Sequence, residues 1–286
     1  MFQPNAKTKL FVLLGNPVGH SLSPAIHNAA FEDLGLHNVY LACPVEDAFL
    51  GAAVKGIKAL SIAGANVTSP HKEAVIPFLD QVSREAELVQ SVNTIVNREG
   101  HLQGTTTDGE GLHHSLKQAD PNYKAGQNIL VLGAGGAARA ASYTLANKGA
   151  QEILIANRSQ EKSDNLRAIL LSNTAVRESK SLPLQKEAFL EALMHCRLII
   201  YSLPHDEQIF LEALSEINSF NQDKFLLDLR YSPARSPVME AFEKCGGRTV
   251  NGLAMLTHQA ALSFELFTGV KAPLEVMQKK AGILPG

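Results

Sequence analysis

The sequence predicts an α/β protein with two α/β domains, and three observations support this prediction. Short apolar runs of β type alternate with longer runs of helical spacing along the chain. Such alternation is typical of parallel strands joined by helices that cover both faces of a sheet. The length of 286 residues exceeds what one hydrophobic core usually serves. A polar segment with Pro and Gly, ADPNYKAG at 119–126, separates two such series.

The first series predicts strands at 9–15, 38–45 and 59–67, and helices at 23–35 and 46–57. Ser23 and Pro24 suit the N-cap and the first position of the earlier helix. Further helical stretches are expected up to residue 89. The run VNTIVNREGHLQGTT at 92–106 indicates two short strands around Glu99-Gly100.

The second series begins near Gly126. It predicts strands at 127–133, 152–157, 197–203 and 224–231, with helices at 136–149 and 159–171. A helix at 253–269 and a short one after Pro273 end the chain. Together with the first series, these elements predict an N-terminal domain with a mostly parallel sheet and a second domain of Rossmann type.

The composition excludes several classes of protein. A net charge of −2 and a pI of about 6.6 leave no basic face for nucleic acid. No apolar run reaches the roughly 18 residues of a membrane helix, and no signal-peptide cleavage pattern is present. The three cysteines are widely separated, so they predict neither a disulfide framework nor a metal site. We expect a cytoplasmic protein without nucleic-acid, membrane or metal partners.

A glycine-rich loop follows the strand expected at 127–133. In ILVLGAGGAARAA, Gly133, Gly135 and Ala138 form a G-x-G-x-x-A pattern between a strand and a helix. In this pattern the first glycine allows a tight turn, the second lets the backbone approach a pyrophosphate, and the alanine permits close packing. The helix N-terminus favours the phosphate charge. The pattern predicts a dinucleotide site, although a structural turn or an S-adenosylmethionine loop is an alternative.

The residues after the next strand favour NADP over NAD. NAD sites usually carry an acidic residue there, which binds the ribose hydroxyls. This chain instead has Asn157, Arg158 and Ser159, followed by Lys162. Arg158 can bind a 2′-phosphate and Lys162 adds positive charge. The alternative is that the two cations are surface residues at the start of a helix and bind no cofactor. The absence of an acid makes S-adenosylmethionine a weak candidate.

Four polar clusters in the first half follow apolar runs, so the predicted parallel sheet would gather them at one edge. Hydroxyls, an amide, an ammonium and a carboxylate at one edge suit a small polyhydroxylated acid. Each residue also has a simpler interpretation: Lys72 as a solvated loop lysine, Ser23 and Asp108 as helix caps, and Asn93 as a turn residue. The clusters are GHSLSP at 19–24, Asn66–Thr68 with Lys72, Ser91–Thr94, and Thr107–Gly109.

The chain resembles the shikimate dehydrogenase family in the order and spacing of its motifs. These are GHSLSPAIHN, NVTSPHK, SVNT, TDGEG, LGAGGAARA, NRS, YSP and GLAMLTHQAA, between about Phe11 and Phe267. The resemblance implies NADPH-dependent reversible reduction of 3-dehydroshikimate to shikimate, in the pathway to chorismate and the aromatic amino acids. It also implies a substrate-binding domain formed by 1–108 and 252–286, an NADP-binding domain at 109–251, and a reaction between them.

The resemblance assigns roles to individual residues. Lys72 and Asp108 match the catalytic pair: the ammonium would stabilise charge on the ketone oxygen and deliver a proton. Ser21, Ser23 and Tyr231 match positions that hold the substrate carboxylate, while Thr68, Asn93 and Gln259 match positions near the ring hydroxyls. The cofactor-binding positions are Gly133, Gly135, Gly136, Ala137, Asn157, Arg158, Ser159, Lys162 and Gly252. A monomer or a homodimer is compatible with these assignments.

Four departures from the family pattern leave alternatives open. Thr106 stands where asparagine is usual, and Arg230 replaces an apolar residue before Tyr231. Ala254 replaces a glycine, and the run Tyr201–Asp206 replaces an Asn-Ala-Thr type sequence with a following glycine. The chain is therefore a shikimate dehydrogenase that tolerates these changes, a relative that acts on quinate or another cyclic polyol acid, or a nucleotide-binding regulatory protein with little turnover.

Overall fold

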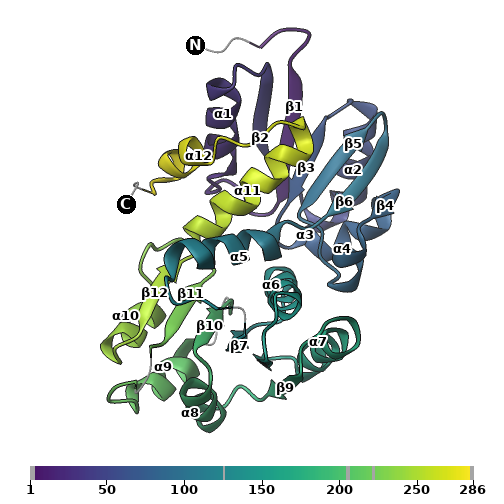
Figure 1. The fold of residues 1–286 in the computed structure, drawn as a ribbon. Helices are drawn as coiled ribbons and strands as arrows, with labels where there is room; N and C mark the ends of the chain where they lie inside the picture. The colour runs from purple at the N-terminus through teal and green to yellow at the C-terminus, as the bar shows by residue number, and fades with distance from the viewer. Residues whose placement is uncertain (1–3, 125, 204–206, 221–222, 284–286) are drawn as a thin grey trace. The chain divides into compact units, whose positions relative to one another are not determined.

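The computed structural model describes residues 4–124, 126–203, 207–220 and 223–283, which divide into two α/β units (Figure 1). Unit 1 comprises Met1–Gly111 and Leu256–Gly286, and unit 2 comprises Leu112–Met255. The boundaries fall within helices α5 (Asp108–Ala119) and α11 (Leu253–Thr268). Unit 1 is therefore built from two separate stretches of the chain.

The sheet of unit 1 has the strand order β2-β1-β3-β5-β6-β4. Strand β5 runs antiparallel to both of its neighbours, whereas the other pairings are parallel. Its strands are β1 (Lys9–Gly15), β2 (Asn38–Pro44), β3 (Gly64–Val67), β4 (Gln81–Val82), β5 (Thr94–Arg98) and β6 (His101–Thr105). Its other helical segments are α1 (Ser23–Asp33), η1 (Asp47–Phe49), α2 (Leu50–Ala59), α3 (His71–Ala74), η2 (Ile76–Phe78), α4 (Arg84–Leu88) and α12 (Leu274–Ala281).

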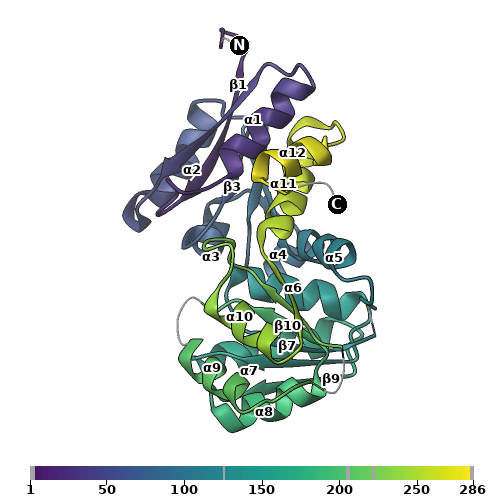
Figure 2. The same ribbon diagram turned by 90° about the vertical axis from the view of Figure 1, so that its left-hand side faces the viewer.

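Both faces of this sheet are buried, because successive side chains of a strand point to opposite faces. In β1, Phe11 and Leu13 join one core with residues of α1, α11 and α12. Val12 and Leu14 join a second core with residues of α2. Figure 2 shows α2 on one side of these strands and α1, α11 and α12 on the other.

The sheet of unit 2 has the all-parallel strand order β12-β11-β10-β7-β8-β9, which is the order of a Rossmann fold. Residues of α5, α6 and α7 cover one face, and residues of α8, α9 and α10 cover the other (Figure 1). The strands are β7 (Asn128–Leu132), β8 (Glu152–Ala156), β9 (Glu178–Leu182), β10 (Leu198–Tyr201), β11 (Phe225–Asp228) and β12 (Arg248–Asn251). The helices are α6 (Gly136–Asn147), α7 (Gln160–Asn173), α8 (Lys186–His195), α9 (Glu207–Ser215) and α10 (Pro237–Lys244).

The predicted fold class is confirmed, and most predicted elements appear within a few residues of their expected bounds. The strand expected at 59–67 is wrong in its first half, because α2 continues to Ala59 and Ser61 turns the chain with a φ of 51°. The predicted N-cap of α1 is also wrong: Leu22 occupies that position. Strand β9, helices α8 to α10 and strand β12 were not predicted. Their patterns are short or broken by polar residues such as the Ser-rich β9.

In the described part of the chain, no helix is long and apolar enough to cross a membrane.

A buried histidine lies in the core of unit 1. His27 on α1 is fully buried, and neither ring nitrogen has a hydrogen-bond partner among the residues that the structure describes. Its ring stacks on Tyr40 with a centroid distance of 4.4 Å, and Phe31, Phe264 and Phe267 surround it. Burial in these apolar surroundings lowers the pKa of His27 from 6.5 to about 3. The folded protein therefore holds this imidazole in its neutral form.

We expect His27 to make unit 1 sensitive to acid. The unfolded chain binds this proton with a pKa near 6.5 and the folded chain only near 3, so acid favours unfolding. The free energy of unfolding should be unaffected above pH 6.5 and should fall by about 1.4 kcal/mol per pH unit below it. Urea unfolding between pH 7 and pH 4.5 measures this slope.

His27→Phe removes the titrating group and should flatten that slope, while His101→Phe at an exposed hairpin position should retain it. A slope that is equal in the wild type and in His27→Phe would contradict this account.

Candidate active site

A lysine–aspartate pair with a half-buried lysine and a buried aspartate lies at one edge of the sheet in unit 1. Lys72 Nζ donates a hydrogen bond to Asp108 Oδ2 at 2.6 Å. The Lys72 side chain is 20% exposed and that of Asp108 is 5% exposed. The interpretation of Lys72 as a solvated loop lysine is therefore wrong. Lys72 lies on the one-turn helix α3, and Asp108 is the first residue of α5.

Contacts on both sides fix the position of α3. The His71 ring nitrogen Nε2 lies 2.6 Å from the carbonyl oxygen of Val45, and the backbone N–H of His71 donates to Thr68. The carbonyl of Lys72 accepts a hydrogen bond from the backbone N–H of Val92 at 2.8 Å. These contacts direct the ammonium of Lys72 towards Asp108. His71, to which the sequence gave no chemical role, therefore has a structural one.

Asn93 is the centre of the polar network around Asp108. Its Nδ2 lies within hydrogen-bond distance of three acceptors, at 2.9 Å from Asp108 Oδ1, 2.9 Å from Thr107 Oγ1 and 3.1 Å from Gln259 Oε1. Its Oδ1 accepts from the backbone N–H of Thr107 at 2.9 Å. Asn93 is 2% exposed, so these contacts satisfy a buried amide.

The direction of β5 places Asn93 at this edge. The sequence predicted that all four polar clusters follow strands, and this is wrong for Ser91–Thr94, which leads into β5. Because β5 is antiparallel to β3 and β6, its beginning lies at the edge where β3 and β6 end. Asn93 thereby meets Thr107 and Asp108, which follow β6.

Ser263 and Asn66 complete the buried network; the sequence placed Asn66 in a polar cluster without a role of its own and did not single out Ser263. Ser263 Oγ contacts Asn66 Nδ2 at 3.0 Å, Thr94 Oγ1 at 2.8 Å and Thr107 Oγ1 at 3.2 Å. Asn66 Oδ1 accepts from the hydroxyl of Tyr40. A signal for Ser263 does exist in the sequence: it stands four residues after Gln259, one helical turn along α11.

Close packing of α5 against α11 brings Gln259 into the network. A Cβ atom at Gly111 would lie 2.8 Å from the backbone nitrogen of Gln259, so only glycine fits without a shift. Thr107 Oγ1 donates to the Gln259 carbonyl at 3.1 Å. The first turn of α5, which carries Asp108, is therefore held against α11.

The remaining predicted substrate residues, Ser21, Ser23, Thr68 and Tyr231, lie outside the hydrogen-bond network described above. Ser21 Oγ accepts a hydrogen bond from the backbone N–H of Ser23 at 3.2 Å, so these two residues form one local turn. The half-buried Thr68 stands at the end of β3, four residues before Lys72. Tyr231 belongs to unit 2, where it follows β11.

In unit 2, the glycine-rich loop has the geometry of an anion-binding turn. Gly133 has a φ of +117°, and a Cβ atom there would lie 2.8 Å from Ser202 Oγ. Gly135 is the N-cap of α6, and apart from the adjoining residues no described atom lies within 4 Å of the position that a Cβ would take. Among the described residues no side chain caps this helix, whose first residues are Gly136 and Ala137. The open space in front of a helix N-terminus fits a pyrophosphate.

The segment after β8 combines one helix cap with two exposed cations. Ser159 Oγ accepts from the backbone N–H of Lys162 at 3.4 Å and so caps α7. Asn157 Nδ2 donates to the carbonyl of Ser159 at 3.1 Å. The side chains of Arg158 and Lys162 are exposed. Gly252 has a packing role, because a Cβ atom there would lie 2.1 Å from the carbonyl oxygen of Leu229.

Of the four departures from the family pattern, three are single residues that the structure describes, and the fourth is a run that it describes in part. Thr106 is buried, and its hydroxyl has no hydrogen-bond partner in the described part of the chain. Tyr201 is fully buried at the end of β10, and Arg230 contacts its ring. Ala254 is the second residue of α11. Of the run Tyr201–Asp206, Pro204 to Asp206 fall outside the described residues.

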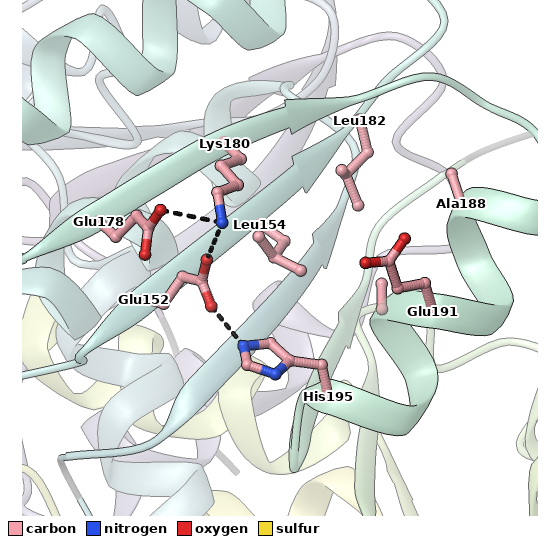
Figure 3. Close-up of a pocket in the computed structure, with 9 residues that line it drawn as sticks. Glu152, Leu154, Glu178, Lys180, Leu182, Ala188, Glu191 and His195 are labelled. Atoms are coloured by element: carbon pink, nitrogen blue, oxygen red, sulfur yellow. Dashed lines mark hydrogen bonds and ion pairs between the residues drawn. The ribbon is translucent and has the colours of Figure 1, made fainter.

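A separate pocket of about 250 Å³ lies between strands β8 and β9 and helix α8 (Figure 3). Lys180 bridges Glu178 at 2.9 Å and Glu152 at 3.1 Å, and His195 of α8 reaches Glu152 at 2.5 Å. Burial opposes ionisation of Glu152, but the hydrogen bonds from His195 and Lys180 hold its pKa below its ordinary value. These groups pair with one another and join α8 to the sheet.

Among the described residues, no group of His, Cys, Asp or Glu side chains could hold a metal ion.

A Rossmann sheet with an open glycine-rich loop, together with an α/β unit that carries a partly buried lysine–aspartate pair, defines a two-unit dinucleotide-dependent oxidoreductase. Three family models match the chain. They are the shikimate dehydrogenase substrate binding domain at 13–95, shikimate / quinate 5-dehydrogenase at 115–235, and the shikimate 5'-dehydrogenase C-terminal domain at 252–281. The chain belongs to the shikimate dehydrogenase family.

Relatives and solved structures agree with this membership. A shikimate dehydrogenase (NADP(+)) of Methanopyrus kandleri is 41% identical over 96% of this chain and 95% of its own. The structure of shikimate 5-dehydrogenase from Listeria monocytogenes in complex with shikimate and NAD has a TM-score of 0.86 at 31% identity, covering 97% of both chains. Quinate dehydrogenase from Corynebacterium glutamicum in complex with NAD has a TM-score of 0.84 at 25% identity, covering 97% and 99%.

The two glycines of the loop should respond differently to substitution by alanine. Gly133→Ala forces a side chain into the left-handed region and against Ser202, so it should lower the free energy of unfolding by about 1–2 kcal/mol or more. Gly135→Ala meets open space at a φ of −75°, so the free energy should stay within about 1 kcal/mol of wild type. Urea unfolding measures the free energy of unfolding of both variants. An equal loss of this free energy in the two would contradict the different roles given to Gly133 and Gly135.

Proposed function

We propose that this protein is an NADP-dependent oxidoreductase that reversibly reduces 3-dehydroshikimate to shikimate. The observation that carries the proposal is the partly buried Lys72–Asp108 pair, joined through Asn93 to Gln259. It places an ammonium and a carboxylate together at a sheet edge rich in amide and hydroxyl groups, as a ketone with neighbouring hydroxyls requires. The names of the relatives, of which the first is a shikimate dehydrogenase (NADP(+)), support the same reaction.

In this proposal, unit 2 binds the nucleotide, and residues 109–251 form the cofactor domain. The open space at Gly135 and the uncapped first turn of α6, which begins with Gly136 and Ala137, would hold the pyrophosphate. The exposed Arg158 and Lys162 would bind the 2′-phosphate of NADP. NADPH held there would supply the hydride for the carbonyl carbon.

Lys72 would act on the oxygen of that carbonyl. As the carbon is reduced, negative charge develops on the oxygen, and the ammonium of Lys72 stabilises this charge and delivers a proton from Nζ. Asp108 holds the ammonium in place at 2.6 Å and can accept a hydrogen bond from a substrate hydroxyl. In the oxidative direction Lys72 takes the hydroxyl proton back.

The other residues of 1–108 and 252–286 would hold and orient the substrate. Ser21 and Ser23 are assigned to the substrate carboxylate. The same role is assigned to Tyr231, which lies outside these two ranges. Thr68 and Gln259 are assigned to the ring hydroxyls. The Nδ2 of Asn93 already faces Asp108, Thr107 and Gln259, so we propose that Asn93 chiefly orients Asp108 and Gln259.

A second candidate is the oxidation of quinate, which differs from the first in substrate and shares the reacting groups. A quinate dehydrogenase has the same fold over nearly the whole chain, and the matched family model covers both activities. The departures from the family pattern at Tyr201, Arg230 and Ala254 also support a substrate other than shikimate.

We also propose a cytoplasmic protein that works as a monomer or homodimer on small-molecule substrates. The free thiols of Cys43, Cys196 and Cys245 support a reducing compartment. Lys72, Asp108, Asn93 and Gln259 come from one chain, so this set does not depend on a second copy.

The experiment that tests the function measures the reduction of NADP⁺ or NAD⁺ with shikimate or quinate as substrate. Turnover with shikimate and NADP⁺ at the highest kcat/KM supports the leading proposal. A higher value with quinate would select the second candidate, and nucleotide binding without turnover of either acid would contradict both.

Lys72→Ala should lower kcat with shikimate by about 10² to 10⁴, because it removes the proton donor and leaves the carbonyl oxygen without a counter-charge. Lys58→Ala is a matched control: Lys58 forms a 2.7 Å ion pair with Asp80 in the same unit, away from the proposed site. This control should retain the wild-type kcat. Near-normal turnover by Lys72→Ala would refute the proposed mechanism.

Arg158→Ala should reduce the preference for NADP⁺ over NAD⁺ by about tenfold or more, since a charge-assisted contact to the 2′-phosphate is lost. The ratio of kcat/KM for the two nucleotides measures this preference. Arg177→Ala, at another exposed position of unit 2, should leave the ratio unchanged. An unchanged ratio in Arg158→Ala would show that this guanidinium does not contact the phosphate.

A further inference from the structure

Arg230 and its contacts form a cluster where β10 and β11 end in unit 2. The guanidinium of Arg230 donates two parallel hydrogen bonds to Asp228, from Nε to Oδ1 at 3.1 Å and from Nη2 to Oδ2 at 2.9 Å. Its Nη1 donates to Glu207 of α9 at 3.1 Å. Its Cζ lies 5.0 Å from the centroid of the Tyr201 ring. These four residues, Arg230, Asp228, Glu207 and Tyr201, are called the Arg230 cluster below.

The burial of this cluster makes its contacts strong and specific. Asp228 and Tyr201 are fully buried, and the side chain of Arg230 is 29% exposed. Burial opposes the charged form of Arg230, but the hydrogen bonds that it donates to Asp228 and Glu207 hold its pKa above its ordinary value. A bidentate arginine–carboxylate pair adds geometric specificity to the electrostatic attraction between the two charges. Two departures from the family pattern, at positions 201 and 230, therefore pack against each other.

The cluster holds the segment Leu229–Tyr231 from one side, and backbone contacts hold it from the other. The N–H of Leu229 donates to the carbonyl of Tyr201 at 2.8 Å, and the carbonyl of Arg230 accepts from the N–H of Gly252 at 3.0 Å. Asp228 also accepts from the backbone N–H of Arg230 and from Ser236 Oγ, at the far end of the same loop. Tyr231 follows directly after the last of these anchored residues.

We infer that Arg230 is a positioning residue that fixes Tyr231 for binding of the substrate carboxylate. This inference rests on the proposed function, in which Tyr231 contacts the substrate. Arg230 itself is occupied by two carboxylates and an aromatic ring, so it acts through the backbone of its own loop and makes no contact with substrate. Preorganisation of a binding group raises affinity because less ordering is needed when the ligand arrives.

A second arginine in the same unit provides a matched control. Arg248 contacts two carboxylates, Asp120 at 2.8 Å and Asp223 at 2.9 Å, and its Cζ lies 5.3 Å from the centroid of the Phe225 ring. It has the same types of partner as Arg230. Arg248 is the first residue of β12, however, so its cluster lies at the opposite end of the strands.

The experiment compares Arg230→Leu with Arg248→Leu in the full-length protein. Arg230→Leu should raise KM for shikimate about tenfold, with kcat within about threefold and KM for NADP⁺ within about twofold of wild type. Arg248→Leu should lower the melting temperature without changing KM for shikimate. Arg230→Lys keeps a cation beside Asp228 but loses the two-pronged contact, so its KM should lie between those of wild type and Arg230→Leu. An unchanged KM in Arg230→Leu, or an equal rise in Arg248→Leu, would overturn the inference.

Arg230→Leu leaves the buried carboxylate of Asp228 without its cation, which destabilises the folded state. If this variant does not fold, the experiment uses the double variant Asp228→Asn with Arg230→Met, which removes both charges. Its expected KM is the same, and the same outcomes support or overturn the inference.

Hydrogen–deuterium exchange separates a failure of this inference from a failure of the proposed function. Uptake in the peptide covering 229–236 should increase in Arg230→Leu and not in Arg248→Leu, whatever the substrate is. Absence of shikimate turnover in the wild type would refute the function alone. Unchanged uptake in this peptide would refute the role of Arg230.

Discussion

Burial of the carboxylate of Asp108 is the constraint on which the site in unit 1 depends. An ionised carboxylate that is removed from water needs a cation or hydrogen-bond donors, or its charge is strongly destabilising. Lys72 supplies the cation and Asn93 supplies a donor, from two different elements of the fold. Each of these partners is itself held by neighbours, through the Lys72–Val92 backbone contact and the Asn93–Thr107 pair. The network therefore extends from one charge to β5, β6, α3, α5 and α11.

Unit 2 has a comparable carboxylate with a different partner. Asp228 is also buried where a strand ends, but an arginine neutralises it and Ser236 donates a second contact. The guanidinium of an arginine keeps its proton under all ordinary conditions, whereas the ammonium of a lysine can give its proton up. The lysine pair is accordingly suited to proton transfer, and the arginine pair to fixing a loop. The choice of cation thus agrees with the chemical role proposed for Lys72 and the positional role proposed for Arg230.

The sequence predicted most strands and helices that have a regular apolar pattern, together with the glycine-rich loop and the residues of the lysine–aspartate pair. It did not predict β9, β12 and helices α8 to α10, whose patterns are short or interrupted. It also placed Asn93 after a strand, because a run of apolar residues does not reveal strand direction. The roles of Ser263 and of the Arg230 cluster depend on contacts between residues far apart in the chain, such as the 197 positions that separate Asn66 from Ser263.

The sequence by itself determined the local properties of this protein: where strands and helices form, where glycine permits a turn before α6, and which side chains can carry charge. Only the tertiary structure decided how these groups combine. The antiparallel direction of β5 brings Asn93 to Asp108, and the Rossmann order of unit 2 brings Tyr201 beside Arg230. The physical reason is that backbone preferences act over a few residues, whereas a buried polar group is stabilised by whichever partners strand pairing and helix packing bring within about 3 Å.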